Sequence, residues 1–174
     1  MYHRMHMNNQ EKNTYVREHL LKALLKRMEQ TGLSGISVSE LAQRAGVGRA
    51  SFYRNFTSIE DILVQEERRL FEAWKENDKK RTDPSRDAFV ESLLNFYKSN
   101  QSFYLSLYRA GLSSIVRDTI LSAIPIEPAD PNPVAYVKSS IAYMIYGWVD
   151  EWMKRGMQES GTELVRMMRS AQQE

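Results

Sequence analysis

Two short segments with the apolar spacing of helices, separated by one glycine, constrain the fold of this chain more than any other feature. The segments are residues 38–45 and 49–56, and Gly46 lies in the turn between them. Phe52 and Phe56 stand four residues apart, so both face one side of the second helix. Two closely packed helices require small residues where they cross and a glycine in the turn. The pattern therefore predicts a helix-turn-helix.

The rest of the sequence repeats the helical spacing. Leu20, Leu24 and Met28 recur every four residues and predict a helix over about residues 14–31. Four of the five prolines fall within residues 125–133, which predicts the clearest loop. No segment has the pattern of a strand, so we expect an all-α fold of about nine helices.

Capping signals mark several of the expected helix starts. In the S/T-x-x-E spacing, a hydroxyl and a carboxylate each accept a hydrogen bond from an otherwise unpaired backbone N–H. This spacing occurs at Ser37–Glu40, Thr57–Glu60 and Ser160–Glu163. Asp83-Pro84 predicts one more start, with the proline at the first helical position.

Charge divides the chain into two parts. Residues 1–57 hold nine lysines and arginines against four acidic residues, whereas residues 58–174 hold 15 against 18. A small basic part on a mildly acidic body is typical of a protein that meets a polyanion with one end. We therefore expect a domain boundary near residue 57, with helices over about 14–31, 38–45 and 49–56 in the first domain.

Several classes of site leave no trace in the sequence. The chain has no cysteine, which excludes disulfides, thiolate nucleophiles and cysteine zinc sites. His3 and His6 have a spacing that metals accept, but no third ligand accompanies them, so we predict no metal site. No phosphate loop, dinucleotide fingerprint, nucleophile elbow or zinc protease signature occurs. We therefore predict no catalytic residues, no cofactor and no enzymatic activity.

The chain also lacks the pattern of a targeting or membrane segment. Its first twelve residues are polar, and the densest apolar stretch, Ala142–Val149, has eight residues against the roughly 20 that span a bilayer. We expect a soluble, cytoplasmic protein with no membrane partner.

The second helix of the motif carries polar side chains opposite its two phenylalanines. Arg49, Ser51, Tyr53, Arg54 and Asn55 are donors of the kind that contact phosphates and base edges. A helix of this kind fits the major groove, so double-stranded DNA is the expected partner.

The segment Ile36–Phe56, followed by Ser58–Leu63, resembles the DNA-binding domain of bacterial transcriptional regulators of the TetR/AcrR type. The resemblance covers about residues 14–65. The C-terminal part is similar to one small C-terminal domain class of that family. This second resemblance is carried by Tyr146-Gly147-Trp148, Trp152, Gly156 and Ser160–Leu164.

The resemblance implies a three-helix DNA-binding domain over residues 1–57, joined through a fourth helix to a helical effector-binding and dimerisation domain over residues 58–174. It also implies a homodimer that places two recognition helices in successive major grooves of an inverted repeat. Carried onto matching positions, the family's DNA contacts fall on Ser37, Ser39, Arg44, Gly48, Arg49, Ala50, Ser51, Tyr53, Arg54 and Asn55. Among these, Arg49 and Ala50 would face base edges.

The sequence departs from the family pattern at four positions. Gly48 replaces a common serine cap, Thr57 and Ile59 replace lysines that often bind phosphate, and Asn55 replaces a frequent histidine. Phosphate binding is therefore expected to depend more on Arg4, Lys12, Arg44 and Arg54.

The aromatic residues of the C-terminal part resemble the lining of the family's effector pocket, which admits a small, largely apolar or aromatic molecule. Alternatively, the same rings form only a helical core. The predicted pocket residues are Trp74, Phe89, Phe96, Tyr97, Phe103, Tyr104, Tyr108 and Tyr143.

The helix over residues 134–152 is apolar almost all round, more than one small domain covers. We expect it and the last helix to form a four-helix dimer interface with a second copy. The predicted interface residues are Ile141, Ile145, Trp148, Trp152, Leu164 and Met168.

The sequence thus predicts a ligand-responsive repressor that binds DNA as a homodimer. A transcriptional activator of the same family is the alternative, with a helical adaptor or an all-α enzyme as remoter ones.

Overall fold

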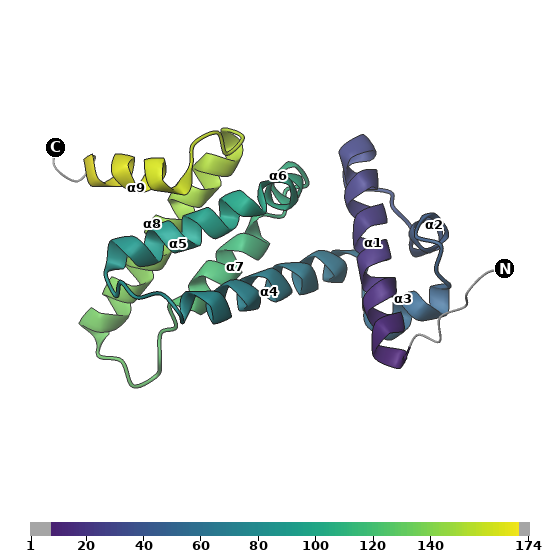
Figure 1. Cartoon of the computed structure of the whole chain (residues 1–174), viewed down its shortest axis with the longest axis horizontal. Coiled ribbons are helices and arrows are strands. Elements are labelled where there is room, and N and C mark those ends of the chain that lie inside the picture. Colours follow the sequence, from purple (N-terminus) through teal and green to yellow (C-terminus); the bar gives the residue numbers. More distant parts are fainter. Residues whose placement is uncertain (1–7, 171–174) are drawn as a thin grey trace. The chain divides into compact units, whose positions relative to one another are not determined.

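The computed structural model describes residues 8–170, and over this range the chain forms nine α-helices and no strand (Figure 1). The helices are α1 (Asn9–Thr31), α2 (Val38–Arg44), α3 (Arg49–Asn55), α4 (Ile59–Asp78), α5 (Arg86–Ser99), α6 (Gln101–Arg109), α7 (Ser113–Ala123), α8 (Asn132–Lys154) and α9 (Gly161–Ser170). The predicted all-α class is confirmed. No described helix is long and apolar enough to cross a membrane.

The chain divides into two compact units, Met1–Glu66 and Glu67–Glu174, so the division falls inside α4. The expected boundary near Thr57 lies at the turn before that helix. The first turns of α4 belong to the first unit because they are bonded to it: Gln65 donates from Nε2 to the carbonyl of Asn55 at 3.2 Å.

In the first unit, α1 packs across both α2 and α3. It begins at Asn9, five residues before the expected start, because Asn8 and Glu11 form a capping box. The Glu11 N–H donates to Asn8 Oδ1 at 2.8 Å, and the Asn8 N–H donates to Glu11 Oε2 at 2.7 Å. Leu20 and Leu24 on the inner face of α1 are fully buried.

The cap predicted at Ser160–Glu163 is complete. The Ser160 N–H donates to Glu163 Oε2 at 2.7 Å, and the Glu163 N–H donates to Ser160 Oγ at 3.2 Å. The box predicted to begin at Thr57 is wrong by one residue, because Asp61 occupies the reciprocal place. Its N–H donates to Ser58 Oγ at 3.1 Å, and its carboxylate accepts the Thr57 N–H at 2.8 Å.

The start predicted for α5 at Asp83-Pro84 is also wrong. Ser85 caps this helix through the N–H of Ala88, at 3.2 Å. Asp83 accepts the N–H of Ser85 at 2.8 Å, so its carboxylate supports the cap residue instead of acting as the cap.

In the second unit, α5 packs chiefly against α9, and α7 packs against α8 (Figure 1). The turn between α8 and α9 has left-handed backbone at two successive residues, Gly156 (φ 80°) and Met157 (φ 52°). Two side chains hold its carbonyls. Lys98 Nζ donates to the carbonyl oxygens of Met157 and Gln158, and Gln101 Nε2 donates to that of Gly156 at 3.2 Å.

Candidate nucleic-acid interface

Helices α2 and α3 form the predicted helix-turn-helix. Gly46 has a φ of 66°, the left-handed conformation that glycine adopts at no steric cost, and the Val47 N–H donates to the carbonyl of Ala42 at 3.0 Å. Phe52 and Phe56 are buried, as expected. These contacts fix α3 against its neighbours and leave the opposite face outward.

Most of the predicted DNA contacts lie at the surface of the motif. Ser51 and Asn55 are half-buried. The exposed residues are Ser37, Ser39, Arg44, Gly48, Arg49, Ala50, Tyr53 and Arg54. The motif therefore presents cations, hydroxyls and one large aromatic side chain to solvent.

Hydrogen bonds within α3 order part of this surface. Arg54 Nη2 donates to Ser51 Oγ at 2.9 Å, and Asn55 Nδ2 donates to the Ser51 carbonyl at 2.8 Å. Gly48 caps α3 without a side-chain bond. Over residues 8–170, neither Arg49 nor Arg54 forms an ion pair with a carboxylate, so both keep a full positive charge for a polyanion.

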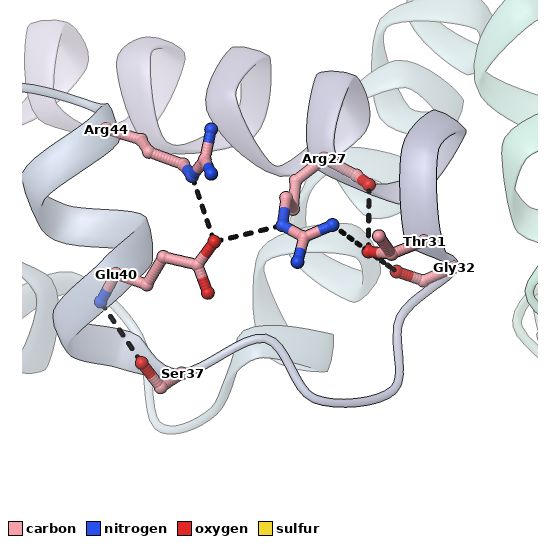
Figure 2. Close-up of polar contacts among 6 residues, drawn as sticks. All are labelled: Arg27, Thr31, Gly32, Ser37, Glu40 and Arg44. Atoms are coloured by element: carbon pink, nitrogen blue, oxygen red, sulfur yellow. Dashed lines mark hydrogen bonds and ion pairs between the residues drawn. The ribbon is translucent and has the colours of Figure 1, made fainter.

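Glu40 links α2 to α1 through two arginines (Figure 2). Its Oε1 atom accepts from Arg27 Nε at 2.9 Å and from Arg44 Nε at 3.0 Å. Ser37 accepts the Glu40 N–H at 3.1 Å, but Glu40 returns no bond to Ser37, so the predicted capping box is only half formed. The hydrogen bonds from Arg27 and then Arg44 hold the pKa of Glu40 below its ordinary value.

A groove of about 470 Å³ separates the start of α1 from α3. Lys12 and Arg54 supply its cations, and Asn9, Asn13 and Asn55 supply amides. The sequence singled out Lys12 but missed Asn9 and Asn13, because they precede the helix start expected from apolar spacing. Three other residues considered for ion binding lie outside the described range: His3, Arg4 and His6.

Most of the predicted effector-pocket residues share one aromatic cluster in the second unit. Its members, joined by ring contacts, are Phe71, Trp74, Phe89, Phe96, Tyr97, Phe103 and Tyr104. Tyr108 is half-buried and has no ring contact within the described chain. Tyr143 lies elsewhere, exposed on α8, and the structure therefore removes it from the predicted pocket.

Two polar groups are buried with this cluster. The Tyr97 hydroxyl is fully buried, and no atom of the described residues is within hydrogen-bonding reach of it. Glu67 of α4 is also buried. Burial and then the negative charge of Glu67 raise the pKa of Tyr97 well above its ordinary value.

Helices α8 and α9 border an apolar groove of about 590 Å³. It is lined by Tyr143, Met144, Gly147, Trp148, Glu151, Trp152, Arg155, Glu159, Leu164 and Met167. Tyr143, Met144 and Met167 are exposed. Of the residues predicted for the dimer interface, Ile145, Trp152, Leu164 and Met168 are buried within the subunit itself, while Ile141 and Trp148 are half-buried.

Comparison with known proteins places the helix-turn-helix in a known class. Residues 20–65 match the profile of the N-terminal domain described as "Bacterial regulatory proteins, tetR family". No curated protein sequence matches the chain.

Solved structures share the fold over nearly the whole chain. Lin0861 from Listeria innocua has a TM-score of 0.76 and 18% identity, with 96% of this chain and 94% of that chain covered. A TetR transcriptional regulator from Streptococcus agalactiae has a TM-score of 0.62 and 15% identity, covering 91% and 93%. FadR from Bacillus subtilis in complex with stearoyl-CoA has a TM-score of 0.55 and 16% identity, covering 86% and 94%.

Proposed function

Since the chain is a DNA-binding transcriptional regulator of the TetR family, we propose that it is a ligand-responsive repressor that binds an inverted-repeat operator as a homodimer. The observation that carries the proposal is the exposed face of α2 and α3, with its unpaired Arg49 and Arg54 on a helix held from behind by buried Phe52. The protein acts in the cytoplasm, where the chromosome lies.

In this proposal α3 enters the major groove and Arg49 reads base edges, because a guanidinium donates two parallel hydrogen bonds to guanine. Ser37 and Ser39 at the start of α2, together with Ser51, Tyr53 and Asn55 of α3, contact phosphate and sugar. Lys12 and Arg54 follow the backbone across the groove between α1 and α3. These phosphate contacts fix the register of the motif on the duplex.

The DNA proposal is tested by selecting fragments that the protein retains from sheared genomic DNA, at two salt concentrations. We expect enrichment of one inverted repeat. Arg49→Ala then weakens binding to that repeat by about 5- to 150-fold, the cost of losing one good base contact. Arg68→Ala, the same change at an exposed position of α4, is the control and leaves binding within about two-fold. Retention without sequence preference, or equal effects of both variants, contradicts the assignment.

The dimer partner that we propose for the groove between α8 and α9 is a second copy of this chain. An apolar groove with Tyr143, Met144 and Met167 exposed matches the core of a homodimer interface. The two copies of α8 and α9 form a four-helix contact, and the buried residues beneath the groove support it from inside each subunit.

Sedimentation of two apolar-to-arginine variants tests the dimer. Met144→Arg places a charge in the groove and shifts the protein to monomers, whereas Ile126→Arg changes an equally exposed apolar side chain in the α7–α8 loop and leaves the dimer intact. A soluble, dimeric Met144→Arg variant contradicts this interface. Trp148→Arg adds a second substitution in the same groove.

For the effector we propose a small, largely apolar or aromatic molecule that binds among the middle helices and moves α4. This helix runs without a break from the DNA-binding unit into the second unit, where Phe71 and Trp74 join the aromatic cluster. Displacing it changes the separation of the two recognition helices, which must match one DNA turn of about 34–36 Å. Support for an acyl chain comes from the FadR structure with stearoyl-CoA.

Titrating stearoyl-CoA against the protein–operator complex tests the effector, with coenzyme A as the control that lacks the chain. Release of DNA by stearoyl-CoA alone supports a repressor relieved by its ligand. Tighter binding instead favours the alternative, an activator or a repressor that needs its ligand. Neither response removes acyl-CoA from consideration only for this chain and leaves the DNA assignment standing. A chain that binds no DNA at all favours a helical adaptor or an enzyme.

A further inference from the structure

One carboxylate oxygen of Glu40 is shared by two arginines that differ in how firmly they are held (Figure 2). Arg27 comes from α1, its side chain is 19% exposed, and its guanidinium also donates to Thr31 Oγ1. Arg44 lies at the end of α2, its side chain is 52% exposed, and within the described chain Glu40 is its one partner. Arg27 is thus fixed in the protein, and Arg44 is the partner that can leave.

The second arginine lowers the cost of that departure. When Arg44 turns away, the carboxylate of Glu40 keeps a cation at 2.9 Å on Arg27 Nε, so no unpaired charge is left behind. An exposed ion pair is weak, and a phosphate brought close to Arg44 competes with it on equal terms. Phosphates at a distance do not compete, because salt screens them beyond about 10 Å.

Arg44 is also a predicted DNA contact, so Glu40 and the DNA backbone compete for the same guanidinium. We propose that Glu40 is a specificity-determining positioning residue: it keeps Arg44 from phosphates in loose complexes with unrelated DNA and gives it up in the closely docked operator complex. The inference rests on the proposed DNA-binding function. It assigns to an acidic residue, which no DNA phosphate contacts, part of the discrimination between operator and other sequences.

The test compares wild type, Glu40→Gln and Glu29→Gln by fluorescence anisotropy, with a random-sequence duplex and with the selected operator. Glu29 is an exposed residue of α1 with no ion pair among the described residues, so its variant reports the effect of losing one negative charge alone. We expect Glu40→Gln to tighten random-duplex binding about two- to five-fold more than Glu29→Gln, the value of one exposed ion pair. Operator binding changes equally in the two variants.

Salt dependence and a second background separate contact from general electrostatics. On the random duplex, freeing Arg44 adds one phosphate contact per subunit, so the slope of log K against log salt steepens by about 0.9 per subunit. In an Arg44→Gln background, Glu40→Gln loses its advantage over Glu29→Gln. A general charge effect survives in that background and overturns the proposal.

Glu40→Asp tests geometry with the charge kept. A side chain shorter by one methylene no longer reaches both arginines, so it behaves like Glu40→Gln on random DNA; wild-type behaviour overturns the proposal. Helix content by circular dichroism confirms that each variant is folded before binding is compared. If wild type binds no duplex, the DNA-binding function fails; if wild type binds and Glu40→Gln equals Glu29→Gln, the role of Glu40 alone fails.

Discussion

Replacing Tyr97 by phenylalanine should stabilise the protein, which is unusual for a change in a core. The Tyr97 side chain is fully buried, and its hydroxyl has no hydrogen-bond partner among the described residues. A buried hydroxyl without a partner costs about 1–3 kcal/mol of desolvation. The ring keeps its packing against Phe96 and Tyr104, with centroids at 5.1 Å and 4.6 Å, so phenylalanine loses no apolar contact. We expect Tyr97→Phe to raise the free energy of unfolding by about 1 kcal/mol.

Urea denaturation followed by circular dichroism measures this change, and the melting temperature should rise by about 2–4 °C for a chain of this size. Tyr108→Phe is the matched control, because Tyr108 is half-buried and water solvates its hydroxyl, so the change is close to neutral. Destabilisation by Tyr97→Phe of more than about 1 kcal/mol would refute the reasoning, because the hydroxyl would then have a partner worth that much.

Two further predictions concern the start of α9. A Cβ atom on Gly161 would lie 2.8 Å from the backbone nitrogen of Asn95, so Gly161→Ala should lower the free energy of unfolding by about 1–3 kcal/mol in urea denaturation, whereas Gly147→Ala, with open space around it, should not lower it. The Ser160 N–H and hydroxyl depress the pKa of Glu163, so this carboxylate stabilises the fold above its unfolded pKa and loses that effect as pH falls through the folded pKa. Glu163→Gln should therefore flatten the decline of stability between about pH 6 and about pH 3, and an unchanged profile would contradict the cap.

Helix positions followed from the sequence because apolar spacing and local caps are properties of neighbouring residues. The turn at Gly46 and the box at Ser160 needed nothing beyond four or five residues, and the structure confirms both. The errors at Thr57 and Asp83 have one cause. Several polar side chains lay within reach of each helix start, and spacing alone did not decide which of them bonded the backbone.

The site was harder to predict, because its contacts join residues distant in sequence. Glu40 was read as a cap for its own helix, but Arg27 of α1 and Arg44 compete for its carboxylate. Likewise, apolar spacing showed that α8 has little polar surface and did not show what covers each part of it. The chain itself covers Ile145, while Tyr143 stays exposed.

The turn between α8 and α9 sets a limit on how this protein can be recombined with others. Its carbonyls are held by Lys98 and Gln101, which belong to α5 and α6, and the buried Met157 keeps a backbone conformation that its own sequence disfavours. The direction of α9 is therefore specified by a distant corner of the unit. A chimaera that imports α8 and α9 alone would inherit the apolar face without the angle that shapes it. The segment that must be exchanged as one piece is α5–α9.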